Sequence, residues 1–214
     1  MRYTIADIHG CSKTFIALIE KLNIKKSDHL YLIGDYIDRG HDSKGVLDII
    51  KELNSKCTVV VLMGNHEDLW IKADDKKIKS IEWKIWIENG GQATLDSFSG
   101  IDQTPYLSYI RKLPKFLELE DFYLVHAEFD FSLPDPFSEA GEYSMLWSRG
   151  RPCSEGKPVI CGHTPLSIEQ IKEGLGTKKI NIDNGCCYLN RIGQGHLLAY
   201  CLDDGQLYRQ KNIE

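Results

Sequence analysis

Three short polar motifs, each directly after an apolar run of strand type, constrain the fold of this chain most strongly. They are Asp7-Ile8-His9-Gly10, Gly34-Asp35-Tyr36-Ile37-Asp38-Arg39-Gly40 and Gly64-Asn65-His66-Glu67. The pattern predicts strands at 2–6, 29–33 and 57–63, and helices between them at 13–22 and 43–53. This order is βαβαβ, for which we expect a parallel sheet with right-handed crossovers.

Local residue types add two expectations for this half of the chain. Ser12 stands where a helix N-cap is expected. The unbroken run Thr58-Val59-Val60-Val61-Leu62 predicts a strand buried on both faces. Open α/β sheets place their chemistry at the carboxyl ends of the strands, so the polar motifs are expected to converge there.

The composition of the chain changes between residues 69 and 115. Trp70, Trp83 and Trp86 lie among lysines, and Asn89-Gly90-Gly91 is typical of a helix stop. We interpret 69–115 as a helical cap inserted over the carboxyl edge of the sheet, where it would shape substrate access. The alternative is a peripheral pair of helices without a role.

Short strand patterns return after the cap, which predicts a mixed or antiparallel second half. They lie at 117–119, 122–125, 159–161, 179–182 and 197–202. Residues 130–157 are rich in proline and glycine and predict a long surface loop. The fold class is therefore α/β, or α+β in some schemes, in a single domain over 1–214.

Composition narrows the classes of function and location. A net charge of −5 over 214 residues argues against a nucleic-acid binder but not against a phosphorylated substrate. Seven cysteines without CxxC spacing, including adjacent Cys186 and Cys187, fit reduced thiols in a cytoplasm. Met1 leads almost directly into a strand pattern, so no signal peptide is expected, and no apolar run is long enough for a membrane span.

Five predicted strand ends carry side chains that can bind metal ions. Asp7 and His9 follow the first strand, and Asp35 and Asn65 follow the second and third. Two later histidines end the strands at 122–125 and 159–161, namely His126 and His163. A single histidine is more often a structural residue, but this convergence predicts two divalent cations bridged by Asp35. Such a site activates water for in-line attack on a phosphate ester.

His66 is adjacent to the predicted ligand Asn65 and therefore points elsewhere, which favours a general acid for the leaving oxygen. Asp38 is the candidate partner, because a carboxylate raises the pKa of histidine. The structural alternative for Asp38 is a turn or helix-cap residue. For Glu67, a first-turn helix carboxylate is the better interpretation.

Arg39 and Arg149 are the candidate phosphate clamps, since a guanidinium binds phosphate oxygens through two parallel hydrogen bonds. Arg39 lies between Asp38 and Gly40 within the second motif. Arg149 follows Leu146-Trp147-Ser148, and a solvent-exposed loop arginine is the alternative there.

The three motifs, with His126-Ala127, Gly162-His163-Thr164 and Ile182-Asp183-Asn184-Gly185, resemble the phosphoprotein phosphatase family of calcineurin-like metallophosphoesterases. The similarity is to its small bacterial and phage serine/threonine phosphatase branch. The resemblance implies a four-layer αββα sandwich with two metal ions, often manganese, with iron, zinc, nickel or cobalt possible. It implies that one ion is held by Asp7, His9 and Asp35, and the other by Asp35, Asn65, His126 and His163. It also implies that His66 with Asp38 donates the proton, and that Arg39 and Arg149 contact the phosphate.

Three positions depart from the family pattern. Met63 stands where relatives commonly have arginine, which removes a positive charge near the pocket. Glu128 replaces a frequent glycine and would either repel an anionic substrate or hydrogen-bond a ligand histidine. Asn184 replaces a commoner threonine, a change expected to matter little.

The leading function implied by this resemblance is a serine/threonine protein phosphatase. The alternative is a hydrolase of dinucleoside polyphosphates such as diadenosine tetraphosphate, and the tryptophan-rich cap could stack a base or grip a peptide. A binding module without activity is disfavoured because no ligand residue is missing. The expected partners are a phosphorylated protein or a small phosphoester, with no nucleic acid or membrane, and the expected state is a monomer or weak oligomer.

Overall fold

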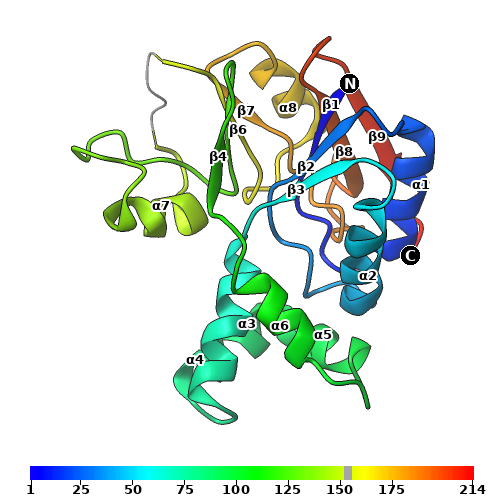
Figure 1. Ribbon diagram of the computed structural model, residues 1–214, viewed down its shortest axis with the longest axis vertical. Coiled ribbons are helices and arrows are strands. Elements are labelled where there is room, and N and C mark those ends of the chain that lie inside the picture. The colour runs from blue at the N-terminus through cyan, green and yellow to red at the C-terminus, as the bar shows by residue number, and fades with distance from the viewer. Residues whose placement is uncertain (152–155) are drawn as a thin grey trace.

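Two β-sheets form the centre of the computed structural model, which describes residues 1–151 and 156–214 (Figure 1). The larger sheet has the strand order β3-β2-β1-β8-β9, and the smaller has the order β4-β5-β6-β7. The first sheet comprises β1 (Arg2–Ile5), β2 (His29–Leu32), β3 (Thr58–Val61), β8 (His196–Cys201) and β9 (Leu207–Lys211). The second comprises β4 (Phe116–Glu118), β5 (Tyr123–Val125), β6 (Val159–Cys161) and β7 (Lys179–Asn181).

The strand directions confirm the expected topology. Strands β1, β2 and β3 are parallel, as the βαβαβ order predicts. The second half of the chain is mixed: β5, β6 and β7 are parallel, whereas β4 is antiparallel to β5 and β8 is antiparallel to β1. Parallel pairing brings the carboxyl ends of β1, β2 and β3 to one edge of the larger sheet.

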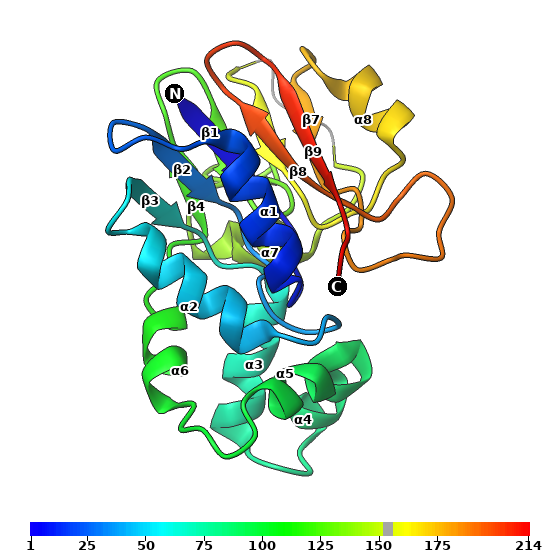
Figure 2. The ribbon, with the colours of Figure 1, turned by 90° about the vertical axis from the view of Figure 1, so that its right-hand side faces the viewer.

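Helices cover both outer faces of the paired sheets (Figure 2). Helices α1 (Ser12–Leu22) and α2 (Ser43–Leu53) pack on the larger sheet, and α7 (Glu142–Trp147) and α8 (Ile168–Gly174) lie on the side of the smaller one. Between the sheets, buried apolar side chains from both meet in one core, among them Ile33, Leu62, Leu124, Ile160 and Ile182. These layers confirm the four-layer αββα sandwich.

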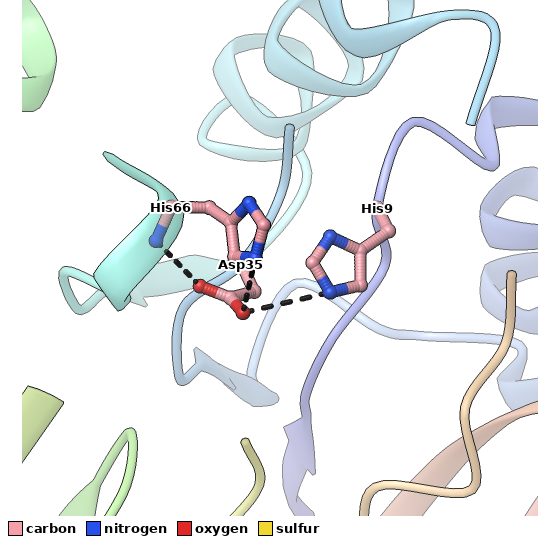
Figure 3. Close-up of side chains that lie close together, drawn as sticks. All are labelled: His9, Asp35 and His66. Atoms are coloured by element: carbon pink, nitrogen blue, oxygen red, sulfur yellow. Dashed lines mark hydrogen bonds and ion pairs between the residues drawn. The ribbon is translucent and has the colours of Figure 1, made fainter. Parts of the chain in front are cut away.

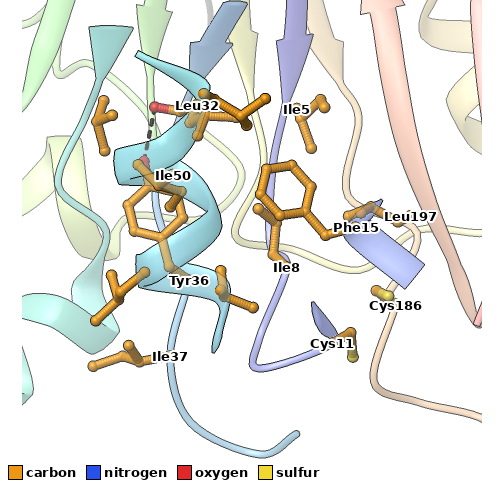
Figure 4. Close-up of a cluster of buried hydrophobic side chains, with 14 of the residues drawn as sticks. Ile5, Ile8, Cys11, Phe15, Leu32, Tyr36, Ile37, Ile50, Cys186 and Leu197 are labelled. Atoms are coloured by element: carbon orange, nitrogen blue, oxygen red, sulfur yellow. Dashed lines mark hydrogen bonds between the residues drawn. The ribbon is translucent and has the colours of Figure 1, made fainter. Parts of the chain in front are cut away.

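The core beneath α1 and α2 also positions the loops that follow β2 and β3 (Figure 4). Phe15 and Ile50 from the two helices pack on Ile5 and Leu32 from the sheet. Beside them the buried hydroxyl of Tyr36 lies 2.8 Å from the carbonyl of Leu32 and 2.7 Å from that of Leu62. Tyr36 thus links the ends of two neighbouring strands just before the polar motifs begin.

The helices α3 to α6, which we call the cap helices, form a separate layer at the carboxyl edge of the larger sheet (Figure 1). They are α3 (Asn65–Lys76), α4 (Ile81–Trp86), α5 (Gln92–Ser97) and α6 (Thr104–Ile110). A turn at Ile87–Gly91 joins α4 to α5, and Gly90 has a φ of 107° there. The helical path breaks where Asn89-Gly90-Gly91 predicts a stop, because only glycine adopts this φ without strain.

Two local predictions for the first half are wrong. Helix α1 begins at Ser12 itself, with Cys11 in the N-cap position and no side-chain cap, because the chain turns one residue earlier than expected. Strand β3 is not buried on both faces: it is the outermost strand of its sheet, so Thr58 is exposed and Val59 is only partly buried.

The prediction of a surface loop over 130–157 is also wrong in part. The segment contains α7, whose Met145 packs on Val125 and Phe129 at the outer face of the smaller sheet. Residues 152–155 lie outside the described part of the chain. Helix α8 and strand β9 are not predicted from the sequence, because both are short and half-exposed. Among the described residues, no helix combines the length and apolarity needed to cross a membrane.

Candidate functional site

Six of the predicted site residues share an unusual backbone conformation. Nine non-glycine residues in the described part of the chain have a positive φ, and these six are among them: Asp7 (52°), His9 (47°), Asp35 (58°), Asp38 (70°), Arg39 (69°) and His163 (66°). Such conformations cost free energy and concentrate where side chains must be presented for binding or catalysis. The strand ends therefore form tight turns that aim polar groups at one point between the sheets.

The turns approach one another closely because of two motif residues that are not predicted ligands, Gly34 and Glu67. A Cβ added at Gly34, whose φ is 101°, would lie 2.6 Å from the Cα of Gly64. The buried carboxylate of Glu67 accepts hydrogen bonds from the backbone N–H groups of Asp35, Tyr36 and Gly64 at 2.8–2.9 Å. Glu67 is the first-turn carboxylate that the sequence predicts, and it also ties the second motif to the third.

Asp35, His9 and His66 together form one group of donor atoms (Figure 3). The Oδ2 of Asp35 lies 3.5 Å from Nε2 of His9 and 3.9 Å from Nε2 of His66. The Nδ1 of His9 lies 2.8 Å from the carbonyl of Ile37 and donates to it. His9 Nε2 therefore carries the lone pair of the ring; it lies near Asp35 and accepts a hydrogen bond from Arg39 at 2.6 Å, and a metal ion bound by His9 would take the place of that contact.

A second group of donor atoms gathers on the other side of Asp35. The Oδ1 of Asn65 lies 2.9 Å from His126 Nε2 and 2.9 Å from His163 Nδ1, and the two imidazole nitrogens are 3.2 Å apart. The Oδ1 of Asp35 lies 3.4 Å from His126 Nε2. The Nδ1 of His126 donates to the carbonyl of Ile33 at 3.0 Å, so its Nε2 faces the group. Asp35 thus contributes one oxygen to each group of donors.

Asp7 joins the two sheets at the edge of these groups. Its buried carboxylate accepts the backbone N–H of His163 at 3.0 and 3.1 Å. The donors that cluster in the first group are His9, Asp35 and His66, so Asp7 is not one of its three members. Its carboxylate keeps lone pairs that the single N–H of His163 does not use.

The shifted pKa values of the buried carboxylates and imidazoles favour the binding of a cation at this site. Burial and the neighbouring Asp183 raise the pKa of Asp7 well above its usual range, and burial raises the pKa of Asp183 to about 7. Burial and His126 lower the pKa of His163 to about 3, so its imidazole is neutral and able to bind a metal. Buried carboxylates beside neutral imidazoles form the kind of donor set that divalent cations satisfy.

His66 and Asp38 form a buried pair beside the donor groups. His66 Nδ1 lies 2.7 Å from Asp38 Oδ2, and His66 Nε2 is buried without a hydrogen-bond partner. Burial acts against protonation of His66, but Asp35 and the hydrogen bond to Asp38 outweigh it, and the pKa of His66 is raised. The imidazolium can therefore present Nε2–H to a group in the site.

Two cap residues hold Asp38 in place. The indole Nε1 of Trp86 donates to its carboxylate at 3.0 and 3.1 Å, and the hydroxyl of Thr94 donates to Oδ1 at 2.6 Å. The backbone N–H of Asp38 in turn donates to Thr94 Oγ1 at 3.0 Å. Sequence reasoning did not identify Trp86 and Thr94 as site residues, because 48 and 56 residues separate them from Asp38.

The two predicted phosphate clamps lie at different depths. The half-buried Arg39 donates to His9 Nε2 at 2.6 Å, and its backbone N–H donates to the carbonyl of Gly90 at 3.2 Å. Arg149 is exposed, and its guanidinium lies 3.4 Å from the carbonyl of His163 and 3.3 Å from Thr164 Oγ1. Arg39 thus lies beside the first donor group, at His9, and Arg149 lies beside the second, at His163.

Residues 3–190 match the family described as "Calcineurin-like phosphoesterase". This chain belongs to that family. The phosphoesterase is 32% identical over 126 residues to a symmetrical bis(5'-nucleosyl)-tetraphosphatase of Vibrio campbellii, an alignment that covers 58% of this chain and 43% of the relative. It therefore spans less than half the length of that tetraphosphatase. It is also 26% identical over 177 residues to serine/threonine-protein phosphatase 1 of Salmonella typhimurium, covering 77% of this chain and 78% of that protein.

Solved structures support the fold of the phosphoesterase. A protein described as a proposed diadenosine tetraphosphatase superposes with a TM-score of 0.67 at 20% identity, covering 100% of this chain and 94% of that one. A serine/threonine phosphatase of Saccharomyces cerevisiae superposes with a TM-score of 0.61 at 15% identity, covering 100% and 80%. At these identities the likeness establishes the architecture alone.

The structure shows what surrounds two of the positions that depart from the family pattern. Met63 is buried, and its backbone N–H donates to the carbonyl of Pro114 at 2.8 Å, so no charge is present there. Among the described residues, the Glu128 carboxylate forms no hydrogen bond or ion pair with a predicted ligand histidine. It accepts the backbone N–H groups of Gly150 and Arg151 at 2.8 Å and pairs with Lys179. Glu128 therefore anchors the loop that carries Arg149.

The cap tryptophans of the phosphoesterase do not form an open platform. Trp70 and Trp86 are buried and stack on each other with ring centroids 6.1 Å apart. Trp83 is partly exposed, but it lines a cavity of about 490 Å³ with Asp74 and Lys77 from the far end of α3. Neither buried ring is accessible to a base or a peptide, so the cap acts on the site through Asp38.

Proposed function

We propose that this phosphoesterase hydrolyses a dinucleoside tetraphosphate with two divalent cations bound between its sheets. One cation would be held by Asp7, His9 and Asp35, and the other by Asp35, Asn65, His126 and His163. The observation that carries the proposal is the placement of two donor groups on either side of the Asp35 carboxylate. Bound there, the cations would neutralise phosphate charge and lower the pKa of a water molecule to supply the nucleophile at neutral pH.

The remaining residues have roles that follow from their positions. His66 holds a proton on Nε2, stabilised by Asp38, and donates it to the leaving oxygen. Arg39 and Arg149 bind the non-bridging oxygens of the attacked phosphate and orient it toward the donor groups. The buried surroundings strengthen these contacts because they exclude water.

The choice of a dinucleotide substrate rests on the relatives. Symmetrical tetraphosphatases of Vibrio campbellii and Wigglesworthia glossinidia brevipalpis are 32% and 33% identical to this chain, whereas the serine/threonine phosphatase is 26% identical. A phosphoserine or phosphothreonine protein remains the second candidate substrate. It is favoured by the longer alignment with the Salmonella phosphatase, which extends over 77% of the chain.

The test compares two substrates on metal-reconstituted enzyme. Diadenosine tetraphosphate and a phosphothreonine peptide are incubated with Mn²⁺, Fe²⁺, Zn²⁺, Ni²⁺ or Co²⁺ in turn, and again after chelation. Metal-dependent formation of ADP, most strongly with Mn²⁺, is the expected result. Phosphate release from the peptide with no ADP from the dinucleotide would replace the proposal with the protein phosphatase.

A further inference from the structure

The segment 185–195, which we call the rim loop, is fixed at both ends beside the donor groups. It follows Asp183 and leads into β8. The buried Asn184 donates from its side-chain amide to the carbonyls of Leu166 and Gly193 at 2.8 Å and accepts the backbone N–H of His196 at 3.1 Å. A threonine has one hydroxyl and cannot make these three bonds, so Asn184 matters more than the sequence suggests.

A continuous series of contacts runs from the donor groups to the tip of the rim loop. Arg39 touches His9 Nε2, and its guanidinium carbon lies 5.5 Å from the ring centroid of Tyr188. The guanidinium carbon of Arg191 lies 3.9 Å from the same centroid. Both distances are within the range of cation–π attraction. The Tyr188 ring therefore contacts both the predicted phosphate clamp and a second arginine.

The charge of Arg191 is not compensated by the protein. Three other arginines pair with aspartates, namely Arg2 with Asp121 and Asp203, Arg111 with Asp74 and Asp75, and Arg151 with Asp130. Arg39, Arg149 and Arg209 resemble Arg191 in forming no ion pair among the described residues, but of these only Arg39 also lies on the Tyr188 ring. Within residues 1–151 and 156–214, no carboxylate or side-chain hydrogen bond is found for the guanidinium of Arg191. Two guanidiniums on one ring repel each other, and an anion between or beside them would relieve that repulsion.

We propose that Arg191, positioned by Tyr188, binds the phosphate groups that lie beyond the one attacked. This inference rests on the proposed function, because only a substrate with a phosphate chain carries such groups. A phosphomonoester offers a single phosphate, which Arg39 and Arg149 already serve. Arg191 thus adds a polyphosphate site at the rim and favours a phosphate chain over a simple ester.

The experiment measures selectivity between a phosphate chain and a monoester. The enzyme at saturating Mn²⁺ is assayed for kcat/KM on diadenosine tetraphosphate and on p-nitrophenyl phosphate, and inorganic tripolyphosphate is titrated as an inhibitor of the second reaction. The variants are Arg191→Gln and Arg191→Lys. The matched control is Arg209→Gln, because Arg209 is an exposed arginine on β9, away from the donor groups.

Arg191→Gln is expected to lower the ratio of the two kcat/KM values by about tenfold, mainly through KM on the dinucleotide, as loss of a charge-assisted hydrogen bond implies. Tripolyphosphate inhibition should weaken by a similar factor, Arg191→Lys should restore part of both, and Arg209→Gln should change neither. An unchanged ratio together with unchanged inhibition in Arg191→Gln would overturn the inference.

Two further outcomes separate this inference from the proposed function. If the dinucleotide is not cleaved but tripolyphosphate inhibits through Arg191, the proposed substrate is wrong and the phosphate site stands. The role of Tyr188 is tested with two variants. Tyr188→Phe should leave the ratio of the two kcat/KM values unchanged, whereas Tyr188→Leu should lower it as much as Arg191→Gln does. Equal behaviour of the two Tyr188 variants would refute the positioning role.

Discussion

At the scale of single residues, the site depends on how each side chain is oriented by a backbone group or a buried partner. Backbone carbonyls of Ile37 and Ile33 fix the imidazoles of His9 and His126 so that Nε2 faces Asp35. The Asp35 carboxylate then stands between two donor groups. Burial acts to raise the pKa of Asp35, but the surrounding imidazoles, His126 first, lower it well below its usual range. The surroundings of Asp35 therefore favour its ionised form.

The Asp35→Asn variant should lose bound metal and turnover together. The amide keeps the size of the side chain but removes the charge that both donor groups share. We expect a loss of activity greater than the roughly 10–100-fold typical when a hydrogen-bond partner of a ligand is removed. Metal content and kcat measured on the same preparation check this, with the exposed Asp96→Asn as control. Full metal content with full turnover would contradict the bridging role.

The His66→Asn variant should keep its metal content but lose turnover in a way that depends on the leaving group. A positioned general acid contributes roughly 10²–10⁴-fold, and most of that is needed only when the leaving oxygen is basic. We expect a much larger fall in kcat on phenyl phosphate than on p-nitrophenyl phosphate. Equal losses on the two esters would assign His66 to metal binding, which its 3.9 Å distance from Asp35 also allows.

At the scale of elements, the cap helices and the site loops form one hydrogen-bonded unit. Trp86 at the end of α4 and Thr94 in α5 hold Asp38, and Asp38 holds His66 at the start of α3. A Cβ at Gly91 would lie 2.5 Å from the Trp86 ring, so the turn between α4 and α5 is matched to that side chain. The cap helices thus hold Asp38, the hydrogen-bond partner of the proposed proton donor His66.

Trp86→Phe tests this connection. It keeps an aromatic ring against Trp70 but removes the N–H that Asp38 accepts. One hydrogen bond to a charged group is worth about 1.5–3 kcal/mol, so kcat should fall by about ten- to a hundredfold. The fall should again be larger on phenyl phosphate than on p-nitrophenyl phosphate, which a purely structural change would not produce. Trp83→Phe is the control, because Trp83 packs edge-on against Trp86, with ring centroids 5.4 Å apart, yet among the described residues it donates no hydrogen bond to Asp38.

Glu128 gives a second prediction at this scale. It anchors the backbone of Gly150 and Arg151, next to Arg149, from the end of β5. Glu128→Ala should leave the metal centre intact and raise KM severalfold, because Arg149 is then less well positioned for phosphate. Steady-state kinetics on p-nitrophenyl phosphate, with metal content as control, measure this. An unchanged KM would show that the Arg149 loop is held by other contacts.

At the scale of the whole molecule, the donor set joins the two sheets. Asp7, His9, Asp35 and Asn65 follow strands of the larger sheet, and His126 and His163 follow strands of the smaller one. Cations bound between them would cross-link layers that already meet through an apolar core and through polar contacts such as those of Asp7 to His163 and of His126 to Ile33. Metal binding should therefore stabilise the fold as a whole, since the unfolded chain does not assemble this set.

Chelation should accordingly lower the melting temperature. At a metal concentration 100 times Kd, the linkage contributes about 2.7 kcal/mol, which corresponds to roughly 5–10 °C for a domain of this size. Thermal denaturation with and without chelator, followed by addition of Mn²⁺, measures the shift. A His126→Asn, His163→Asn double variant should show a much smaller response. A shift of equal size in that variant would place the stabilising metal elsewhere.

The sequence by itself determined the residues that can bind metal and the strands that deliver them. Strand-type runs followed by Asp, His or Asn are local patterns, and parallel βαβαβ units bring their carboxyl ends to one edge by geometry alone. Edge strands, short helices and half-exposed strands leave a weaker pattern in the sequence. For this reason the predicted burial of β3 was wrong, and α7, α8 and β9 were not predicted.

Tertiary structure alone decided the direction of side chains that meet across long sequence separations. Glu128 turns to the Arg149 loop, Trp86 turns inward to Asp38, and Tyr188 brings Arg191 beside Arg39. No local pattern encodes these contacts, because each depends on how separate layers pack and on which buried polar group needs a partner. The candidate metal-binding residues were readable from the motifs, whereas the contacts that support them and the arrangement of the rim loop required the fold.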